Sequence, residues 1–142
     1  MLQNAPLVSY VPVHDLERAR RFYENTLGLA PGKPQGPGRH YTCGNGTAFF
    51  MYPSPGAGTN KASCAFWQVD DIEAAVVWLK GRGVVFEEYD TPQVKTVNSV
   101  FAGGGARAAW FKDTEGNIMA LVQEGEGCVR RGGPCEGENA DE

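Results

Sequence analysis

The feature that most constrains this chain is a seven-residue pattern that occurs twice, 56 positions apart. Residues 13–19 read Val-His-Asp-Leu-Glu-Arg-Ala, and residues 69–75 read Val-Asp-Asp-Ile-Glu-Ala-Ala. The shared pattern is Val-x-Asp-[Leu/Ile]-Glu-x-Ala, and Phe22 matches Trp78 at the same offset. Because an internal repeat marks a repeated structural unit, we expect two copies of one folding module.

The repeat predicts, in each copy, a strand that ends and a helix that begins. An apolar run, residues 7–11 in the first copy, leads into each pattern, and an aspartate then offers an acceptor to the free N–H groups of a helix start. Asp70 and Glu73 also have the spacing of a capping box. Apolar residues recur at helical spacing until Gly28 or Gly83, where glycine favours a helix end. We therefore expect two amphipathic helices.

Turn residues divide the rest of the chain into short strands and loops. Residues 30–38 are rich in proline and glycine and predict a loop. Gly44-Asn45-Gly46 favours a hairpin turn between strands at 40–43 and 47–52. For the second copy the pattern predicts strands at 63–69 and 84–89 with a helix at 71–81 between them, and then a long stretch to Gly105 that includes residues 97–101. A hairpin of 107–112 and 118–122, which turns through Asp-x-x-Gly-Asn, closes the module.

These elements predict one domain, residues 1–123, with a short linker between its two modules. Module one covers residues 7–52, the linker 53–61 and module two 62–123. Residues 124–142 are rich in glycine and acidic side chains and have little to bury, so we expect a disordered tail.

Composition and charge exclude several classes of function. The net charge of −4 argues against nucleic acid or an anionic membrane as partner, and the arginines at 18, 20 and 21 fit a solvated helix face. No apolar run approaches a membrane span, and residues 1–6 lack the regions of a signal peptide, so we expect a cytoplasmic protein. We interpret the four cysteines as free thiols: Cys43, Cys64, Cys128 and Cys135.

The two modules, with Phe22-Tyr23 and Leu27-Gly28 on the first helix and Trp110-Phe111-Lys112-Asp113-x-x-Gly116-Asn117 near the end, resemble the vicinal oxygen chelate superfamily. This superfamily includes glyoxalases, bleomycin-resistance proteins and extradiol dioxygenases. The resemblance implies an α+β fold in which two tandem βαβββ modules form a cupped, barrel-like mixed sheet with the helices outside. It also implies a homodimer whose cavity is built partly from both subunits.

Enzymes of this superfamily usually hold a divalent metal with His, Glu or Gln side chains from four strands. The corresponding positions in this sequence are Val8, Phe50, Cys64 and Ala120. Three of these side chains cannot coordinate a metal, and a lone cysteine is typical of a small buried residue. We therefore expect no metal and no cofactor.

What remains of the family's site is a cavity, which predicts a protein that binds a small aromatic or hydrophobic organic ligand without the usual metal. The alternative for the same aromatic residues is that they fill a packed core. Strand alternation, together with the implied ligand positions, gives the expected cavity lining: Tyr10, Phe50, Cys64, Phe66, Gln68, Trp110 and Ala120.

Two other functions stay open at this stage. One is an isomerase, epimerase or lyase on the same scaffold, acting through His40, Tyr10 or Cys64 or through an unrecognised metal. His40 is preferred over His14, which takes a helix-cap place and is expected to be solvated. The other is a structural or regulatory module whose partner docks on a sheet edge.

Overall fold

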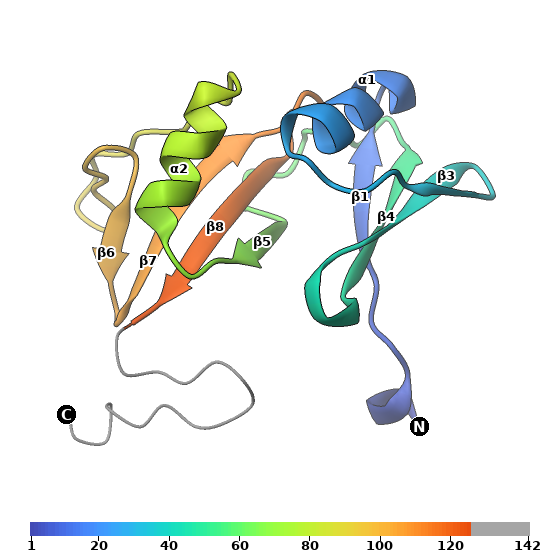
Figure 1. Cartoon of the computed structure of the whole chain (residues 1–142), viewed down its shortest axis with the longest axis horizontal. Coiled ribbons are helices and arrows are strands. Elements are labelled where there is room, and N and C mark those ends of the chain that lie inside the picture. Colours follow the sequence, from blue (N-terminus) through green and yellow to red (C-terminus); the bar gives the residue numbers. More distant parts are fainter. Residues whose placement is uncertain (126–142) are drawn as a thin grey trace.

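The computed structural model describes residues 1–125, which form two four-stranded mixed sheets, each accompanied by one α-helix (Figure 1). The expected tail lies outside the described residues apart from Glu124 and Gly125, and so do the thiols of Cys128 and Cys135. Module one consists of β1 (Ser9–Val13), α1 (Leu16–Arg21), β2 (Lys33–Gln35), β3 (Gly38–Thr42) and β4 (Ala48–Pro53). Module two consists of β5 (Ala65–Gln68), α2 (Ile72–Gly81), β6 (Phe101–Gly103), β7 (Ala106–Lys112) and β8 (Ile118–Glu124).

Both modules have the order βαβββ and the same sheet topology. Sheet A has the strand order β1-β4-β3-β2, and sheet B has the equivalent order β5-β8-β7-β6. In each sheet the first strand pairs in parallel with the last, and the other pairs are antiparallel. The predicted fold class is confirmed, although the cupped sheets do not close into a barrel.

The two helices begin at the repeated aspartates. The Asp15 carboxylate accepts a hydrogen bond from the Arg18 amide at 3.1 Å, and Asp71 accepts one from the Ala74 amide at the same distance. The capping box predicted at Asp70 is therefore wrong, because the helix starts one residue later. As predicted, each helix leads into a glycine with positive φ, +83° at Gly28 and +94° at Gly83.

Several predicted strand boundaries are corrected. β1 lies two residues later than the predicted strand at 7–11, and β2 forms inside the predicted loop at 30–38. No strand forms at 84–89, where only Phe86 bridges β7, and the long stretch to Gly105 contains the short strand β6, which begins at Phe101. The reason is that β8 pairs with β7 along its whole length. Only the opposite edge of β7 is left for the segment 84–89 and for β6, and β6 occupies part of it.

The helices and one face of each sheet share a single hydrophobic core. Alternate residues of the longer strands are buried there, Val11, Val13, Tyr41 and Met51 from sheet A and Ala109, Phe111, Met119 and Leu121 from sheet B. Because side chains alternate across a strand, the residues between them point to the opposite face of each sheet, which we call the open face. Within residues 1–125, no helix is long and apolar enough to span a membrane.

Candidate ligand-binding site

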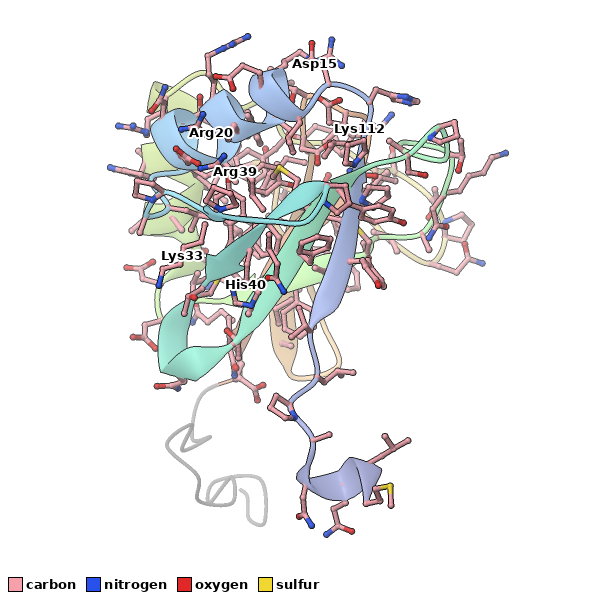
Figure 2. All side chains as sticks on the ribbon, turned by 90° about the vertical axis from the view of Figure 1, so that its right-hand side faces the viewer. Asp15, Arg20, Lys33, Arg39, His40 and Lys112 are labelled. Carbon is pink, nitrogen blue, oxygen red and sulfur yellow. The ribbon has the colours of Figure 1, made fainter. Side chains whose placement is uncertain are left out.

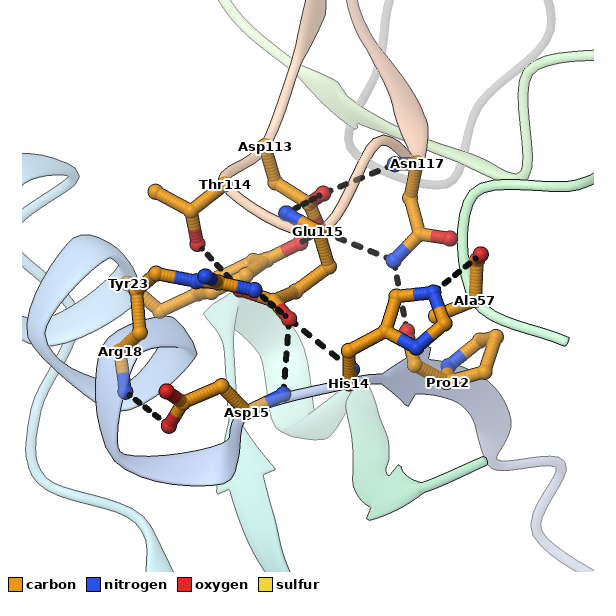
Figure 3. A network of polar contacts seen from close by, with 10 residues as sticks. All are labelled: Pro12, His14, Asp15, Arg18, Tyr23, Ala57, Asp113, Thr114, Glu115 and Asn117. Atoms are coloured by element: carbon orange, nitrogen blue, oxygen red, sulfur yellow. Dashed lines mark hydrogen bonds and ion pairs between the residues drawn. The ribbon is translucent and has the colours of Figure 1, made fainter. Parts of the chain in front are cut away.

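A buried carboxylate, Glu115, joins the two modules (Figure 3). It lies in the turn between β7 and β8 and accepts hydrogen bonds from the backbone amides of His14 and Asp15, both at 2.9 Å. The Arg18 guanidinium donates to it from Nε at 2.8 Å and from Nη2 at 2.9 Å, and the Thr114 hydroxyl donates at 2.8 Å. Burial raises the pKa of Glu115, but these donors outweigh burial and hold the pKa at about 2.

This network corrects the prediction that Arg18 belongs to a solvated helix face. Its side chain remains 45% exposed, but its guanidinium is paired with a carboxylate that is fully buried. The sequence did not indicate the pairing, because Glu115 lies 97 residues from Arg18. The Gly and Asn beside Glu115 already account for a turn there, so the carboxylate needed no further role. The available signal was the density of hydrogen-bonding side chains in that turn.

The same turn makes a second connection through Asp113. The Tyr23 hydroxyl donates to the Asp113 carboxylate at 2.7 Å, and burial together with this carboxylate raises the pKa of Tyr23 well above its usual value. Asn117 donates to Asp113 at 3.0 Å and to the Pro12 carbonyl oxygen at 2.8 Å. The linker approaches closely here, since a Cβ at Gly58 would lie 2.5 Å from the Glu115 carbonyl oxygen. The turn thereby fixes sheet B relative to β1 and α1.

The open face of sheet A carries an aromatic floor. Tyr10 pairs with Phe50 across β1 and β4, and their ring centroids are 6.1 Å apart. Tyr52 packs against both rings, at 4.9 Å from Tyr10 and 6.3 Å from Phe50. Beside this floor is a hollow of about 620 Å³, which falls in the range of small-molecule sites. Its lining is Val8, Tyr10, Lys33, Pro34, Gln35, His40 and Phe50.

The open face of sheet B is also aromatic. Phe66, Ala120 and Trp110 are consecutive cross-strand partners on β5, β8 and β7 and therefore share one face. Phe66 is 60% exposed, whereas Trp110 packs against Tyr89 and Phe101 at centroid distances of 5.4 and 6.1 Å. The segment before β6 thus covers one side of Trp110 and leaves Phe66 open.

Between the modules runs a groove of about 510 Å³, to which β5 contributes Phe66 and Gln68 and module one contributes Phe49. The Gln68 amide also donates to Glu124 at 3.0 Å. Cys64 stands just before β5, with its sulfur 3.4 Å from the sulfur of buried Met119. Cys64 is exposed rather than the small buried residue predicted, although partial burial of its thiol raises the pKa of that group. Cys43 and Cys64 are both free, as expected.

The predicted lining residues therefore fall into two groups rather than one cavity. Tyr10, His40 and Phe50 meet on the open face of sheet A, and Phe66, Gln68, Trp110 and Ala120 lie on the open face of sheet B. Cys64 contacts a residue of the core instead. The reason is that the two sheets of one chain do not close around a common space.

The positions where the superfamily places metal ligands do not fit a metal in this chain. Val8 and Phe50 line the hollow of sheet A, whereas Cys64 and Ala120 belong to module two. Hydrocarbon side chains supply no lone pair, and one thiol does not complete a coordination shell. Among residues 1–125, no three His, Cys, Asp or Glu side chains come together in an arrangement that could hold a metal ion.

Two βαβββ modules with helices outside and open aromatic sheet faces define a protein of the vicinal oxygen chelate type. A family model described as the Glyoxalase/Bleomycin resistance protein/Dioxygenase superfamily matches residues 6–121, and the chain belongs to this family. A search of curated proteins found no match.

Solved structures agree with this assignment. TnmS3, an antibiotic-binding protein from Streptomyces sp. CB03234, is 26% identical, covers 87% of this chain and 98% of its own, and has a TM-score of 0.60. A glyoxalase/bleomycin resistance protein from the same organism is 27% identical, covers 84% of this chain and 100% of its own, and has a TM-score of 0.58. Oxidase ChaP-H1 shares the fold at 22% identity and a TM-score of 0.62, over 91% of this chain and 100% of its own.

Proposed function

We propose that this protein binds a small, flat, aromatic or hydrophobic organic molecule on its open sheet faces, without a divalent metal. The observation that carries the proposal is the aromatic floor of Tyr10, Phe50 and Tyr52. These rings contact one another, yet Tyr10 is 69% exposed beside a hollow of ligand size. Exposed aromatic patches of this kind mark binding surfaces, because free energy is gained when a ligand covers their apolar area and removes it from water.

The absence of a metal in this proposal rests on side-chain chemistry. Val8, Phe50 and Ala120 replace the side chains that would coordinate an ion. The likeness to the antibiotic-binding protein TnmS3 supports sequestration of an organic molecule as the activity.

A neutral fluorescent probe, N-phenyl-1-naphthylamine, tests the site. We expect its emission to rise on binding, and we expect Phe50→Ala to weaken its Kd about tenfold because one ring contact is lost. Trp78→Ala is the matched control, since it removes a half-exposed aromatic ring from α2, away from the open faces. Equal loss of binding in both variants would contradict this location.

Native mass spectrometry with elemental analysis of the purified protein tests the chemistry. A co-purified organic molecule supports the proposal. Zinc, nickel, iron or manganese near one equivalent would overturn the metal-free part of it.

We also propose that two copies pair so that their open faces enclose a shared cavity. The support is that one chain leaves large aromatic rings uncovered on both sheets, with Tyr10 at 69% and Phe66 at 60% exposure. Sedimentation at micromolar concentration should show a dimer, and a mass of 15.3 kDa would contradict the pairing.

A further inference from the structure

Four residues form one row across the open face of sheet A. Lys33 is the cross-strand partner of His40, His40 of Phe50, and Phe50 of Tyr10. Residues directly opposite one another project from the same face, and neighbouring strands lie about 4.8 Å apart. The row therefore runs from a cationic end on β2 and β3 to an aromatic end on β4 and β1, and Figure 2 shows Lys33 and His40 close together.

The charge at this end of the row is unbalanced. Lys33 supplies the only formal charge among the residues that line the hollow, and none of them is acidic. Within residues 1–125, neither Lys33 nor His40 takes part in an ion pair or a side-chain hydrogen bond. Arg39, by contrast, lies on the other face and donates to the Gly32 carbonyl oxygen at 2.7 Å. This local positive end stands out in a chain whose net charge is −4.

We propose that the ligand of this hollow carries an anionic group next to its flat ring system. The rings lie on Tyr10 and Phe50, and a carboxylate, sulfonate or phenolate oxygen accepts hydrogen bonds from the Lys33 ammonium and an N–H of His40. This inference rests on the proposed function and adds the chemical class of the ligand. Unpaired donors beside an apolar floor favour an anion, because a charge-assisted hydrogen bond gains strength where water is partly excluded.

The competing explanation for Lys33 is protection of a sheet edge. β2 is an edge strand of sheet A, and an exposed lysine beside Pro34 discourages pairing with another chain. That role needs no ligand and predicts no preference for anions. The two explanations therefore differ in the effect of Lys33 on the binding of charged and neutral probes.

A pair of dyes with the same anilinonaphthalene rings separates them. 8-Anilinonaphthalene-1-sulfonate carries a sulfonate, and N-phenyl-1-naphthylamine lacks it. We expect the sulfonate to bind about fivefold more tightly. Lys33→Gln should remove most of this preference and leave the neutral dye unchanged, Lys33→Arg should retain it, and His40→Gln should reduce it in part.

Lys61→Gln is the matched control, because it deletes the same charge from the exposed linker. If it lowers sulfonate binding as much as Lys33→Gln does, net charge explains the effect and the inference fails. A neutral dye that binds through Phe50 without any preference for the sulfonate overturns the anionic ligand but leaves the proposed function standing. If neither dye binds, the proposed function and this inference fall together.

Discussion

Asp15 and Asp71 occupy equivalent places at the starts of α1 and α2, yet the backbone beside them is held by different partners. The Ile72 amide of α2 donates to the side chain of Gln123, at 2.8 Å, within module two. The amides before α1 donate instead to Glu115, which belongs to the other module. The backbone amides at the start of α2 thus donate to a neutral side chain of the same module. Those at the start of α1 donate to a buried carboxylate of the other module.

The open faces of the two sheets differ in a parallel way. Sheet A combines its aromatic floor with Lys33 and His40, whose side chains make no hydrogen bond or ion pair with the described residues. Sheet B presents Phe66 and Trp110, and its polar Gln68 is already engaged by Glu124. The two modules therefore share one scaffold but differ in the contacts that hold their helix starts and in the side chains of their open faces.

Replacement of Glu115 should have the largest effect on stability. Glu115→Ala leaves the Arg18 guanidinium and two backbone amides without their acceptor, so we expect a loss of about 3 kcal/mol in the free energy of unfolding. Gln123→Ala, the equivalent change at α2, should cost about 1 kcal/mol. Chemical denaturation measures both. Equal losses would show that the two helix starts depend on their partners to the same degree.

Acid should weaken the same contact between the two modules, which depends on the ionised Glu115 carboxylate. The pKa of Glu115 is about 2 in the folded protein and 4.5 as its ordinary value. A lowered folded pKa contributes stability that is present above pH 4.5 and is lost as the pH falls towards 2. Glu115→Gln should therefore flatten the decline in melting temperature over this interval. A variant whose decline matches the parent would place the acid sensitivity in other carboxylates, such as Glu24, whose pKa is also lowered.

Two tyrosines separate contacts between modules from contacts within one. Tyr23→Phe removes the bond to Asp113 in module two, and Tyr41→Phe removes a bond to Glu24 inside module one, each 2.7 Å long. Tyr23→Phe should cost about 1.5 kcal/mol, because it takes a donor from a buried carboxylate. Tyr41→Phe should cost less, since Glu24 keeps the charged donor Arg20, whereas the donors left to Asp113 are uncharged amides. Thermal melts measure both effects, and Tyr23→Phe should have the lower melting temperature. A lower melting temperature for Tyr41→Phe would mean that the contact between modules contributes little to stability.

The smallest changes in stability should come from the open faces. Tyr10→Ala and Phe66→Ala remove rings that are 69% and 60% exposed, so we expect shifts within about 0.5 kcal/mol. A loss of several kcal/mol for either variant would mean that the rings fill a packed core. Denaturation at low protein concentration makes this measurement on the single chain.

Sequence reasoning captured the features that depend on local periodicity. The repeat, the helical spacing of apolar residues and the glycines after each helix predicted a strand followed by an amphipathic helix in each of two modules, because a chain must bury one face of each such element. The complete βαβββ order was implied by the family resemblance. Strand alternation through the positions implied by the family resemblance predicted Tyr10, Phe50, Phe66 and Trp110 as the lining of a cavity, with a packed core as the alternative. The strand predicted at 84–89 does not form, and the loop predicted at 30–38 contains β2. Neither difference could be predicted from local sequence, because pairing at a sheet edge depends on which distant strands compete for it.

Contacts between distant residues were decided only by the tertiary structure. Glu115 and Arg18 are 97 residues apart, and Lys33 and Tyr10 come into one row with His40 only through strand register. The sequence determined which faces are apolar, since each strand and helix carries that information within a few residues. The angle between the sheets, the buried charge that holds it and the pairing of a cationic end with an aromatic floor arise from packing, which depends on all the elements at once.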